Sequence, residues 1–558
     1  MPYSERICNF EQEKACGCGK KEQLGQAKLG VNMRDFQKSG RSLVIAQNGI
    51  CATSHPLAAQ TAIAILQAGG NAVDAGVAAA MVLNICEPQM NGLGGDCFAL
   101  LRPAGEHHVI GLNASGRAPA SANAAALRAA NMANMPDNTA EAVTMPGAVD
   151  GMLRLVADHG SMDLAQILAP GIRYADEGVP VAPRVAFDWA ESASKLLGGA
   201  RDHYLNSGQP LRVGDIFRAP CQAQVLRAIA ANGRAGFYEG EVADDLLGSL
   251  QALGGGHTKA DMAQVSADYV CPVSATYRGH ELLELPPNGQ GVTALLLANI
   301  LSYFEFEGMD PVGAARTHIL AEASKLAYDA RNQFVADPAH MDDAVGYMIS
   351  PETAAKLAAL ISPNAILPLP SAPLENVHKD TVYLTVVDKN RMALSLIYSI
   401  FNSFGTGLAS EKFGILFHNR GSGFNLIEGH PNEYGPRKRP MHTIIPAMLR
   451  SGENLMPFGV MGGQYQAAGH AYFMSNIVDF GMDMQAAIDA PRSFAERGAL
   501  WLETGFAPGV AQELADIGHD VKWRRGAIGG AQAIQIDTAR GILIGASDPR
   551  KDGCALGY

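Results

Sequence analysis

The stretch "HKDTVYLTVVDKNRMALSLIYS", residues 378–399, contains two strand-like runs separated by a polar turn. Residues 381–387 and 393–400 are rich in Thr, Val, Tyr, Leu and Ile, and residues 388–391 between them are polar. β-Branched and aromatic residues favour strands, so the pattern predicts a hairpin. Thr381 opens the first strand directly after Asp380. It is either an ordinary strand residue or, if the chain is cut before it, a catalytic amino terminus.

The sequence around this hairpin alternates between helical and strand-like patterns. Residues 368–380 are rich in proline and polar side chains, which indicates an exposed segment leading into Thr381. Residues 55–85 predict two helices broken at Gly69-Gly70, and residues 97–115 predict a hairpin with its turn near Gly105. Helical patterns dominate residues 146–253, recur at 317–334, and return near 465–488 and 507–517. The mixture predicts an α/β or layered α+β fold.

Composition and charge exclude several classes of protein. The 558 residues carry a net charge of −12, which disfavours a nucleic-acid partner. No apolar run reaches membrane-spanning length, and the first residues lack the apolar region of a secretory signal. Nine cysteines in so long a chain do not suggest a disulfide framework. We therefore expect a cytoplasmic protein with reduced thiols.

Residues 1–40 are interpreted as an N-terminal extension. Cys8, Cys16 and Cys18 lack a fourth ligand at definite spacing, so neither a metal nor a cofactor is expected. The chain also has no phosphate-binding loop, no nucleophile elbow and no H-E-x-x-H motif. The glycine-rich "NGLGGDCF", residues 91–98, precedes a strand and does not open a helix, unlike a dinucleotide-binding loop. "VMGGQYQ", residues 460–466, places Gly462 and Gly463 after an apolar run. Two such glycines form either a tight turn, which the residues alone favour, or an oxyanion hole.

The chain from about Gly49 to Tyr558 resembles the γ-glutamyltransferase family of N-terminal nucleophile hydrolases. The resemblance rests on many ordered blocks, among them "EPQMNGLGGDCF", "PPNGQGVTALLLANIL", "HILAEASKLAYDAR", "DTVYLTVVD", "GPRKRPMHTIIPAML" and "ASDPRKDGCALGY". It implies a four-layer αββα sandwich built from two pieces of one chain. The large piece is residues 41–380 and the small piece is residues 381–558, forming one fused domain after cleavage between Asp380 and Thr381.

The resemblance also assigns roles to individual residues. Thr381 is expected to be the nucleophile, with its own α-amine as general base, because an α-amine with a pKa near 8 is partly neutral at physiological pH. Ser399 takes the place of a threonine that bonds the nucleophile, and Gly462 and Gly463 match the oxyanion glycines. Asn402 and Phe404 fall in a segment beside the site, where a purely structural turn is the alternative.

Several positions depart from the residues that clamp a γ-glutamyl group. Ser115 stands where the family has a carboxylate-binding arginine, and Arg117 follows two residues later. Phe401 replaces an asparagine, and Gly423 replaces the aspartate that pairs with the substrate ammonium. His442 and Thr443 replace paired serines, and the loop between Phe424 and Gly435 is short. Arg117, Phe401, His442 and Thr443 are therefore predicted to line a pocket for a smaller or less charged acyl group.

A divergent branch of the family shares these features and contains amidases of small acids, among them oxamate amidohydrolase of purine breakdown. Three functions are weighed: a self-processing amidohydrolase of a small carboxylated amide, a γ-glutamyltransferase or glutathione hydrolase, and a non-catalytic binding scaffold. The expected partners are a small-molecule amide and the two fragments themselves. A homodimer is left open.

Overall fold

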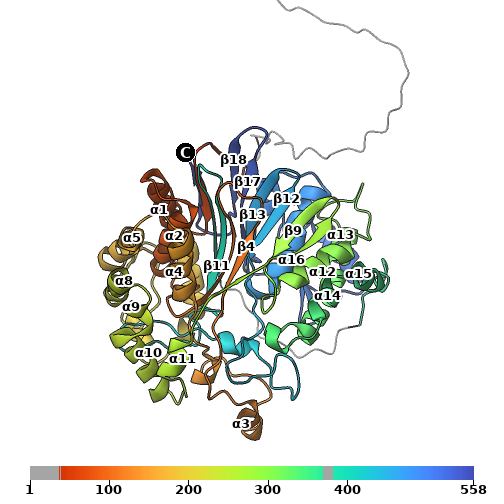
Figure 1. The fold of residues 1–558 in the computed structure, drawn as a ribbon. Helices are drawn as coiled ribbons and strands as arrows, with labels where there is room; N and C mark the ends of the chain where they lie inside the picture. Colours follow the sequence, from red (N-terminus) through yellow and green to blue (C-terminus); the bar gives the residue numbers. More distant parts are fainter. Residues whose placement is uncertain (1–36, 38, 369–380) are drawn as a thin grey trace, which may run out of the picture.

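Two seven-stranded sheets pack face to face in the centre of the molecule, and helices cover both outer surfaces (Figure 1). The computed structural model describes residue 37, residues 39–368 and residues 381–558. Asp380 and the cysteines at positions 8, 16 and 18 lie outside these described residues. The arrangement confirms the predicted four-layer αββα sandwich.

The first sheet carries Thr381 at one end of a central strand. Its strand order is β19-β2-β10-β11-β3-β4-β7, and every neighbouring pair is antiparallel. The strands are β2 (Ile50–Thr53), β3 (Asp96–Arg102), β4 (Ile110–Ala114), β7 (Asp268–Val270), β10 (Val382–Val387), β11 (Ala393–Ser399) and β19 (Cys554–Gly557). The predicted hairpins β10–β11 and β3–β4 are both present.

The second sheet is also antiparallel and has the order β1-β18-β17-β13-β12-β9-β8. Its strands are β1 (Val44–Ala46), β8 (Val273–Tyr277), β9 (His280–Glu284), β12 (Ala447–Ser451), β13 (Asn454–Met461), β17 (Gly530–Asp537) and β18 (Ile542–Ser547). Both sheets combine strands from before and after position 381. The two predicted pieces therefore share both sheets.

Different helices cover the two sheets. The first sheet is covered by α1 (Pro56–Gln67), α2 (Ala72–Cys86) and α4 (Ala148–His159), with α5 (Leu164–Glu177) and α8 (Pro220–Asn232) outside them. The second is covered by α12 (Gly291–Leu301), α13 (Ala314–Phe334), α16 (Gln466–Val478) and α17 (Met484–Asp489). The predicted break between α1 and α2 is confirmed: Gly69 has a φ of 101°, and the Asn71 side chain caps α2.

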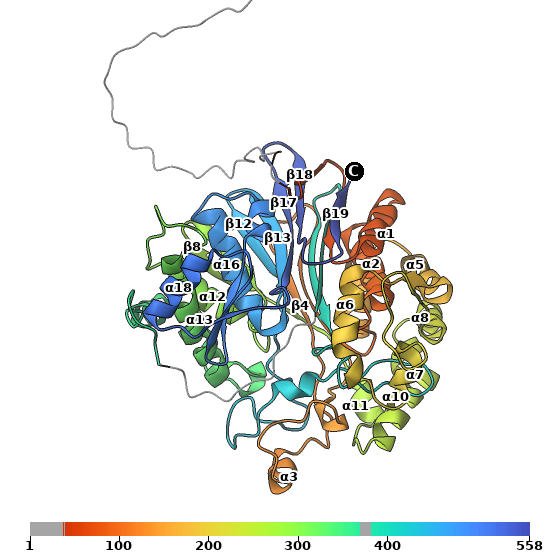
Figure 2. The same ribbon diagram turned by 180° about the vertical axis from the view of Figure 1, so that it is seen from behind.

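Smaller elements complete the chain, and Figure 2 shows those on the far side. The helices are α3 (Ala124–Ala129), α6 (Pro183–Ser192), α7 (Ala200–Tyr204), α9 (Ala235–Tyr238), α10 (Gly240–Ala252), α11 (Lys259–Ala263), α14 (Ala344–Ile349), α15 (Pro351–Ala358) and α18 (Pro508–Ile517). The remaining strands are β5 (Val179–Pro180), β6 (Ile216–Phe217), β14 (Ser493–Glu496), β15 (Ala499–Leu502) and β16 (Val521–Trp523). Among the described residues, no helix has the length and apolar character needed to cross a membrane.

Strand β10 is buried on both faces, which explains its nearly continuous apolar sequence. Val382, Leu384 and Val386 pack toward the helices. Tyr383 and Val387 pack into the core between the two sheets. Because side chains alternate along a strand, odd-numbered residues of this strand point between the sheets.

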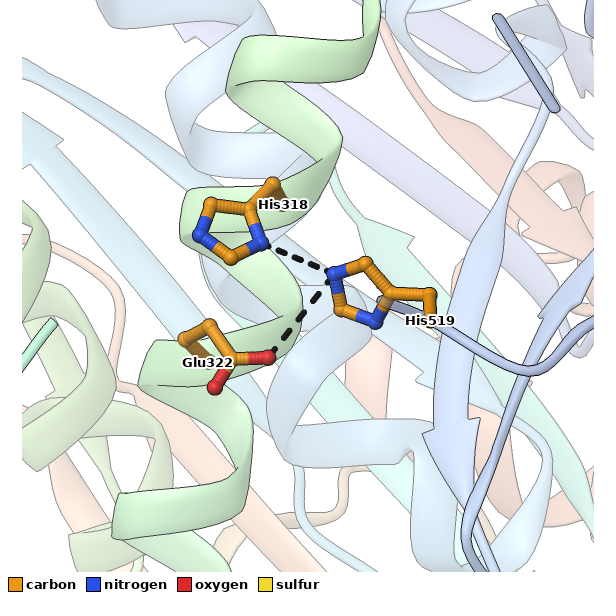
Figure 3. Close-up of side chains that lie close together, drawn as sticks. All are labelled: His318, Glu322 and His519. Atoms are coloured by element: carbon orange, nitrogen blue, oxygen red, sulfur yellow. Dashed lines mark hydrogen bonds and ion pairs between the residues drawn. The ribbon is translucent and has the colours of Figure 1, made fainter. Parts of the chain in front are cut away.

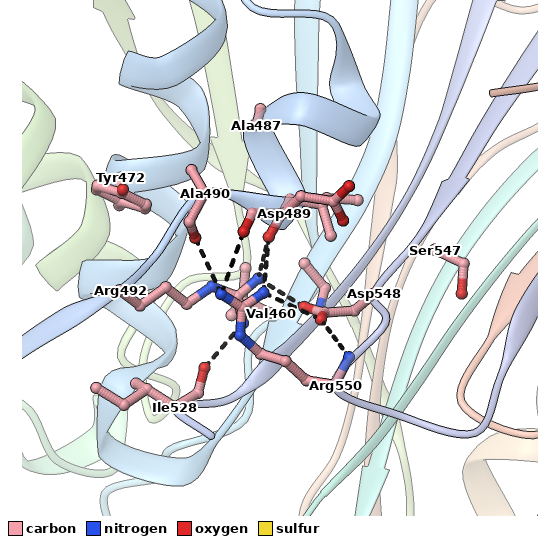
Figure 4. A network of polar contacts seen from close by, with 12 residues as sticks. Val460, Tyr472, Ala487, Asp489, Ala490, Arg492, Ile528, Ser547, Asp548 and Arg550 are labelled. Carbon is pink, nitrogen blue, oxygen red and sulfur yellow. Dashed lines mark hydrogen bonds and ion pairs between the residues drawn. The ribbon is translucent and has the colours of Figure 1, made fainter. Parts of the chain in front are cut away.

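An ion-pair network lies at the ends of β17 and β18 in the second sheet, near Gly462 (Figure 4). Arg492 donates to Asp548 at 2.6 Å and to the Ile528 carbonyl at 2.8 Å. Burial alone would raise the pKa of Asp548, but Arg492 and Arg550 lower it below its usual value. Gly529, next to Ile528, lies so close to Gly462 that a Cβ on Gly462 would meet its Cα at 2.9 Å. The network therefore supports the backbone beneath the Gly462 turn.

Candidate active site

Thr381 lies at the start of β10, where the two sheets face each other. The alternation of β10 directs its side chain between the sheets, and it is only 1% exposed. Val382 is paired with Tyr398 in the β10–β11 register, so Ser399 is the next residue along the partner strand. The predicted nucleophile and its predicted hydroxyl partner are thus on neighbouring buried strands.

Ser399 stabilises the unusual backbone that follows β11. Its Oγ accepts a hydrogen bond of 2.8 Å from the Phe401 amide. Phe401 has a φ of 80°, a conformation that bulky residues rarely adopt. Such strain is retained where the surroundings impose it, and it often marks functional sites. The predicted bond between Ser399 and the nucleophile remains a prediction.

Gly462 and Gly463 follow β13 directly, with φ angles of 124° and 56°. Side chains rarely tolerate such angles, so glycine is required at both positions. Within the part of the chain that the structure describes, neither buried amide N–H donates a hydrogen bond. Buried amides are nearly always paired, so two free ones fit an oxyanion hole better than a plain turn.

Gln466 is a site residue that the sequence reasoning missed. Its Oε1 accepts a hydrogen bond of 2.9 Å from the Ile445 amide, which fixes the orientation of the side-chain amide. Its Nε2 then donates toward Thr381 Oγ1 at 3.5 Å. Gln466 donates to the hydroxyl oxygen, so it does not compete with a base for the hydroxyl proton. The only signal in the sequence was that this glutamine lies shortly after the glycine pair in "GGQYQ", two residues after Gln464.

A second missed residue, Gln290, holds the carbonyls beside the glycine turn. Its Nε2 donates to the Thr443 carbonyl at 2.7 Å and to the Gly463 carbonyl at 3.1 Å. Arg331 donates to its Oε1 at 2.9 Å. Thr443 and Gly463 are therefore held by a single side chain.

Asp96 is the centre of a buried polar cluster beside Ser399. It is paired with Ser399 in the β3–β11 register and is fully buried. Its carboxylate accepts from the Gly116 amide at 2.9 Å and contacts His442 Nε2 at 3.2 Å. Burial alone would raise its pKa, but His418, His442 and Arg420 lower the pKa to about 2. Asp96 is therefore ionised at neutral pH.

His442 and Thr443, both predicted to bind substrate, belong to this cluster. His442 is fully buried, and its ring stacks at a tilt on Phe98 with centroids 4.6 Å apart. Burial, together with the charge of Arg420, lowers its pKa to about 3, so the imidazole is neutral. Thr443 Oγ1 accepts a hydrogen bond of 3.1 Å from Arg420.

Arg420, which the sequence reasoning also missed, is the buried cation of the site. It is 0% exposed, and its guanidinium carbon lies 4.0 Å from the centre of the Phe401 ring. Burial lowers its pKa to about 9, which still leaves it charged at neutral pH. A charged residue three positions after the apolar run "GILF" was the available signal.

Arg117 lies in a different environment from these buried residues. Its Nη1 forms an ion pair of 2.9 Å with Asp337 and donates to the Arg437 carbonyl at 3.2 Å. Its side chain is 41% exposed and lines a pocket with Gly116 and Arg439. Ser115 turns its hydroxyl toward Asn113 at 2.9 Å. Arg420 is therefore a second candidate for the substrate-binding role predicted for Arg117.

Gly423 has little room for a larger residue. A Cβ at this position would meet the Met441 carbonyl oxygen at 2.7 Å. An aspartate here would require the backbone to move. The local packing therefore does not accommodate the aspartate that the family resemblance would place at this position.

A second cluster, which shares no residue with these contacts, has the donors of a metal site (Figure 3). His318 Nδ1 and His519 Nε2 are 2.8 Å apart, and Glu322 Oε1 lies 3.8 Å from the same His519 nitrogen. These donors already have partners: Lys325 lies 2.6 Å from Glu322 Oε1, and His318 Nε2 bonds the Ser362 carbonyl at 2.7 Å. A metal would have to displace Lys325. As it stands, the cluster ties α13 to the turn after α18.

A buried threonine at the head of an inner strand, between two antiparallel sheets covered by helices, defines an N-terminal nucleophile hydrolase. The model of the gamma-glutamyltranspeptidase family matches residues 58–558, and the chain belongs to this family. It is an enzyme of the amidohydrolase and acyltransferase type found there.

Its relatives include proenzymes with different substrates. Oxamate amidohydrolase proenzyme of Klebsiella pneumoniae is 34% identical and is aligned over 92% of this chain and 99% of its own length. The glutathione hydrolase-like YwrD proenzyme of Bacillus subtilis is also 34% identical, with the same coverage. The crystal structure of cephalosporin acylase from Bacillus halodurans is 38% identical, covers 95% of this chain and 99% of its own, and has a TM-score of 0.87.

Proposed function

We propose that this protein cuts itself between Asp380 and Thr381 and then hydrolyses the amide bond of a small carboxylated substrate, such as oxamate. Residues 41–380 become the large piece and residues 381–558 the small piece, while residues 1–40 remain an extension. The observation that carries the proposal is Thr381, buried between the sheets with Gln466 on its hydroxyl and two unpaired glycine amides nearby.

The cut proceeds by an N–O acyl shift. Thr381 Oγ1 attacks the Asp380 carbonyl carbon, the peptide C–N bond breaks, and the hydroxyl proton passes to the nitrogen, which becomes the new α-amine. Water then hydrolyses the ester and releases the Asp380 carboxylate. The new amine is the general base that the nucleophile requires.

Amide hydrolysis uses the same hydroxyl. The α-amine accepts its proton while Oγ1 attacks the substrate carbonyl, and the Gly462 and Gly463 amides receive the oxyanion. The leaving ammonia takes a proton from the α-ammonium, and water releases the acid from the ester. Gln466 holds the hydroxyl in place before it attacks.

The preference for a small acidic acyl group follows from the pocket polarity. Phe401 fills volume, and Gly423 supplies no carboxylate for an ammonium group. Losing a charge-assisted bond costs about 1.5–3 kcal/mol. A γ-glutamyl group would therefore bind less well than an acyl group that carries only a negative charge.

The test compares two substrates on the mature enzyme. We expect ammonia release from oxamate and little release of aniline from a γ-glutamyl anilide. A higher kcat/KM for the anilide would contradict the proposal and favour γ-glutamyl transfer. Turnover of neither substrate by a properly cut enzyme would also contradict it. A cytoplasmic location and a role in purine breakdown are part of the proposal, and cell fractionation tests the first.

A further inference from the structure

We propose that Arg420 is the carboxylate anchor of the acyl pocket and selects substrates whose acyl group carries a carboxylate. The inference rests on the proposed function and names the residue that gives it specificity. It assigns to Arg420 the role that the sequence suggests for Arg117.

The guanidinium of Arg420 is buried but only partly bonded. Its Nη1 donates to Thr443 Oγ1 at 3.1 Å. Within the described residues, its Nε and Nη2 have no hydrogen-bond partner. A buried charged donor without a partner is costly, so such groups are normally paired or bound to a ligand.

Asp96 does not satisfy this guanidinium. Arg420 Nε lies 3.9 Å from Asp96 Oδ2, which is beyond hydrogen-bond distance. The Asp96 carboxylate is instead bonded by the Gly116 amide and His442. Asp96 therefore offsets part of the positive charge of Arg420 but does not form a hydrogen bond with its Nε or Nη2 donors.

The neighbouring groups leave Arg420 as the cation of this cluster. His442 is neutral because its pKa is lowered to about 3, and burial lowers the pKa of His418 as well. Arginine presents a planar fork that matches a carboxylate with two parallel bonds. A substrate carboxylate is the ligand that the two free nitrogens fit best.

The anchor is connected to the reacting atoms through one short segment. Thr443, which holds Arg420, is bonded through its carbonyl to Gln290, and Gln290 also bonds Gly463. Two residues later, the Ile445 amide orients Gln466, which contacts Thr381. An acyl group held by Arg420 can therefore be aligned with the nucleophile and the oxyanion glycines.

Phe401 controls access to the anchor. Its ring lies over the guanidinium at 4.0 Å, and its backbone has a φ of 80°. The contact stabilises the buried charge by a cation–π interaction. The ring must shift when a carboxylate reaches the free nitrogens, and its bulk limits the length of the acyl chain.

Arg117 provides an internal control, because it is paired with Asp337 and partly exposed. The experiment measures kcat/KM for oxamate and for its neutral analogue oxamide, using wild type, Arg420→Met, Arg420→Lys and Arg117→Met. We expect Arg420→Met to lower the value for oxamate about 10- to 100-fold and for oxamide less than threefold. Arg420→Lys should keep part of the preference for oxamate over oxamide. Arg117→Met should leave the ratio of the two kcat/KM values unchanged.

Equal losses for both substrates would overturn the proposal, and a selective loss in Arg117→Met would return the anchor to Arg117. Calorimetry with oxalate, the acid expected as product, tests the anchor without turnover and so separates it from the proposed function. Arg420→Met should lose oxalate binding, and Arg117→Met should keep it. Unchanged oxalate binding in Arg420→Met would also overturn the inference. If Arg420→Met does not fold, the same comparisons are made with Arg420→Lys. A preserved preference for oxamate together with unchanged oxalate affinity in Arg420→Lys would count against a two-bond contact between the Arg420 guanidinium and the carboxylate.

Discussion

Gln466 Nε2 lies 3.5 Å from Thr381 Oγ1, while its Oε1 is bonded to the Ile445 amide. This pair of contacts orients a buried hydroxyl without removing its proton. It gives the predicted nucleophile a positioning residue on the first turn of α16.

Replacing Gln466 tests that role. Gln466→Leu should lower kcat about 10- to 100-fold with little change in KM, because the hydroxyl loses its donor but the acyl pocket is untouched. Gln466→Glu has no side-chain amide to donate to Thr381 Oγ1, so this variant should recover little of the lost kcat. Steady-state kinetics on the cut enzyme measure both. A change in KM alone would place Gln466 in substrate binding.

The two glycines proposed to form the oxyanion hole, Gly462 and Gly463, give a second prediction. Gly463→Val should lower kcat about 100-fold or more, because a side chain is strained at a φ of 56° and would move the amide donors. The matched control is Gly452→Ala, a turn glycine between β12 and β13 with a φ of 59° and open space around it. Turnover of Gly463→Val as fast as that control would mean that Gly463 only shapes a turn.

Phe401→Ala should widen acyl specificity. Removing the ring exposes the Arg420 guanidinium and enlarges the pocket, so kcat/KM for a longer carboxylated amide, such as glutaramate, should rise relative to oxamate. Truncating a buried phenylalanine costs about 3–5 kcal/mol of stability, so the melting temperature should fall. Assays must therefore be run well below it. An unchanged ratio of the two substrates would show that Phe401 does not border the acyl chain.

The sequence predicted the strands around Thr381 better than the polar cluster beside them. Strand β10 was predictable because burial on both faces leaves a continuous apolar run. Asp96, Arg420 and Gln466 were missed because they come from three distant segments, and only the folded register brings them together. Arg117 was favoured because it is close in sequence to the expected position, although its partner Asp337 lies 220 residues away. Local patterns do not contain such partners.

A histidine at the α13–α18 contact gives a prediction about pH. Burial, together with His318 and Lys325, lowers the pKa of His519 to about 4, whereas the unfolded value is 6.5. The unfolded chain therefore binds one more proton between these values, and His519 lowers stability as pH falls from 6.5 to 4. The contribution is at most about 1.4 kcal/mol per pH unit. The melting temperature of uncut Thr381→Ala should fall more steeply in this window than that of the same chain with His519→Gln. Identical slopes would show that His519 does not contribute.

The last prediction concerns the cut itself. Purified wild type should give two bands of about 40 and 20 kDa, estimated from ordinary residue mass, because the N–O shift needs only the Thr381 hydroxyl and water. The smaller band should begin TVYLTVV, as read by Edman sequencing. Thr381→Ala lacks the hydroxyl that receives the acyl group, so it should remain a single inactive chain. Thr381→Ser keeps a hydroxyl in the same buried place and should still be cut, which separates loss of chemistry from loss of folding. A small fragment that starts at any other residue would move the nucleophile away from Thr381, and with it the role of Gln466.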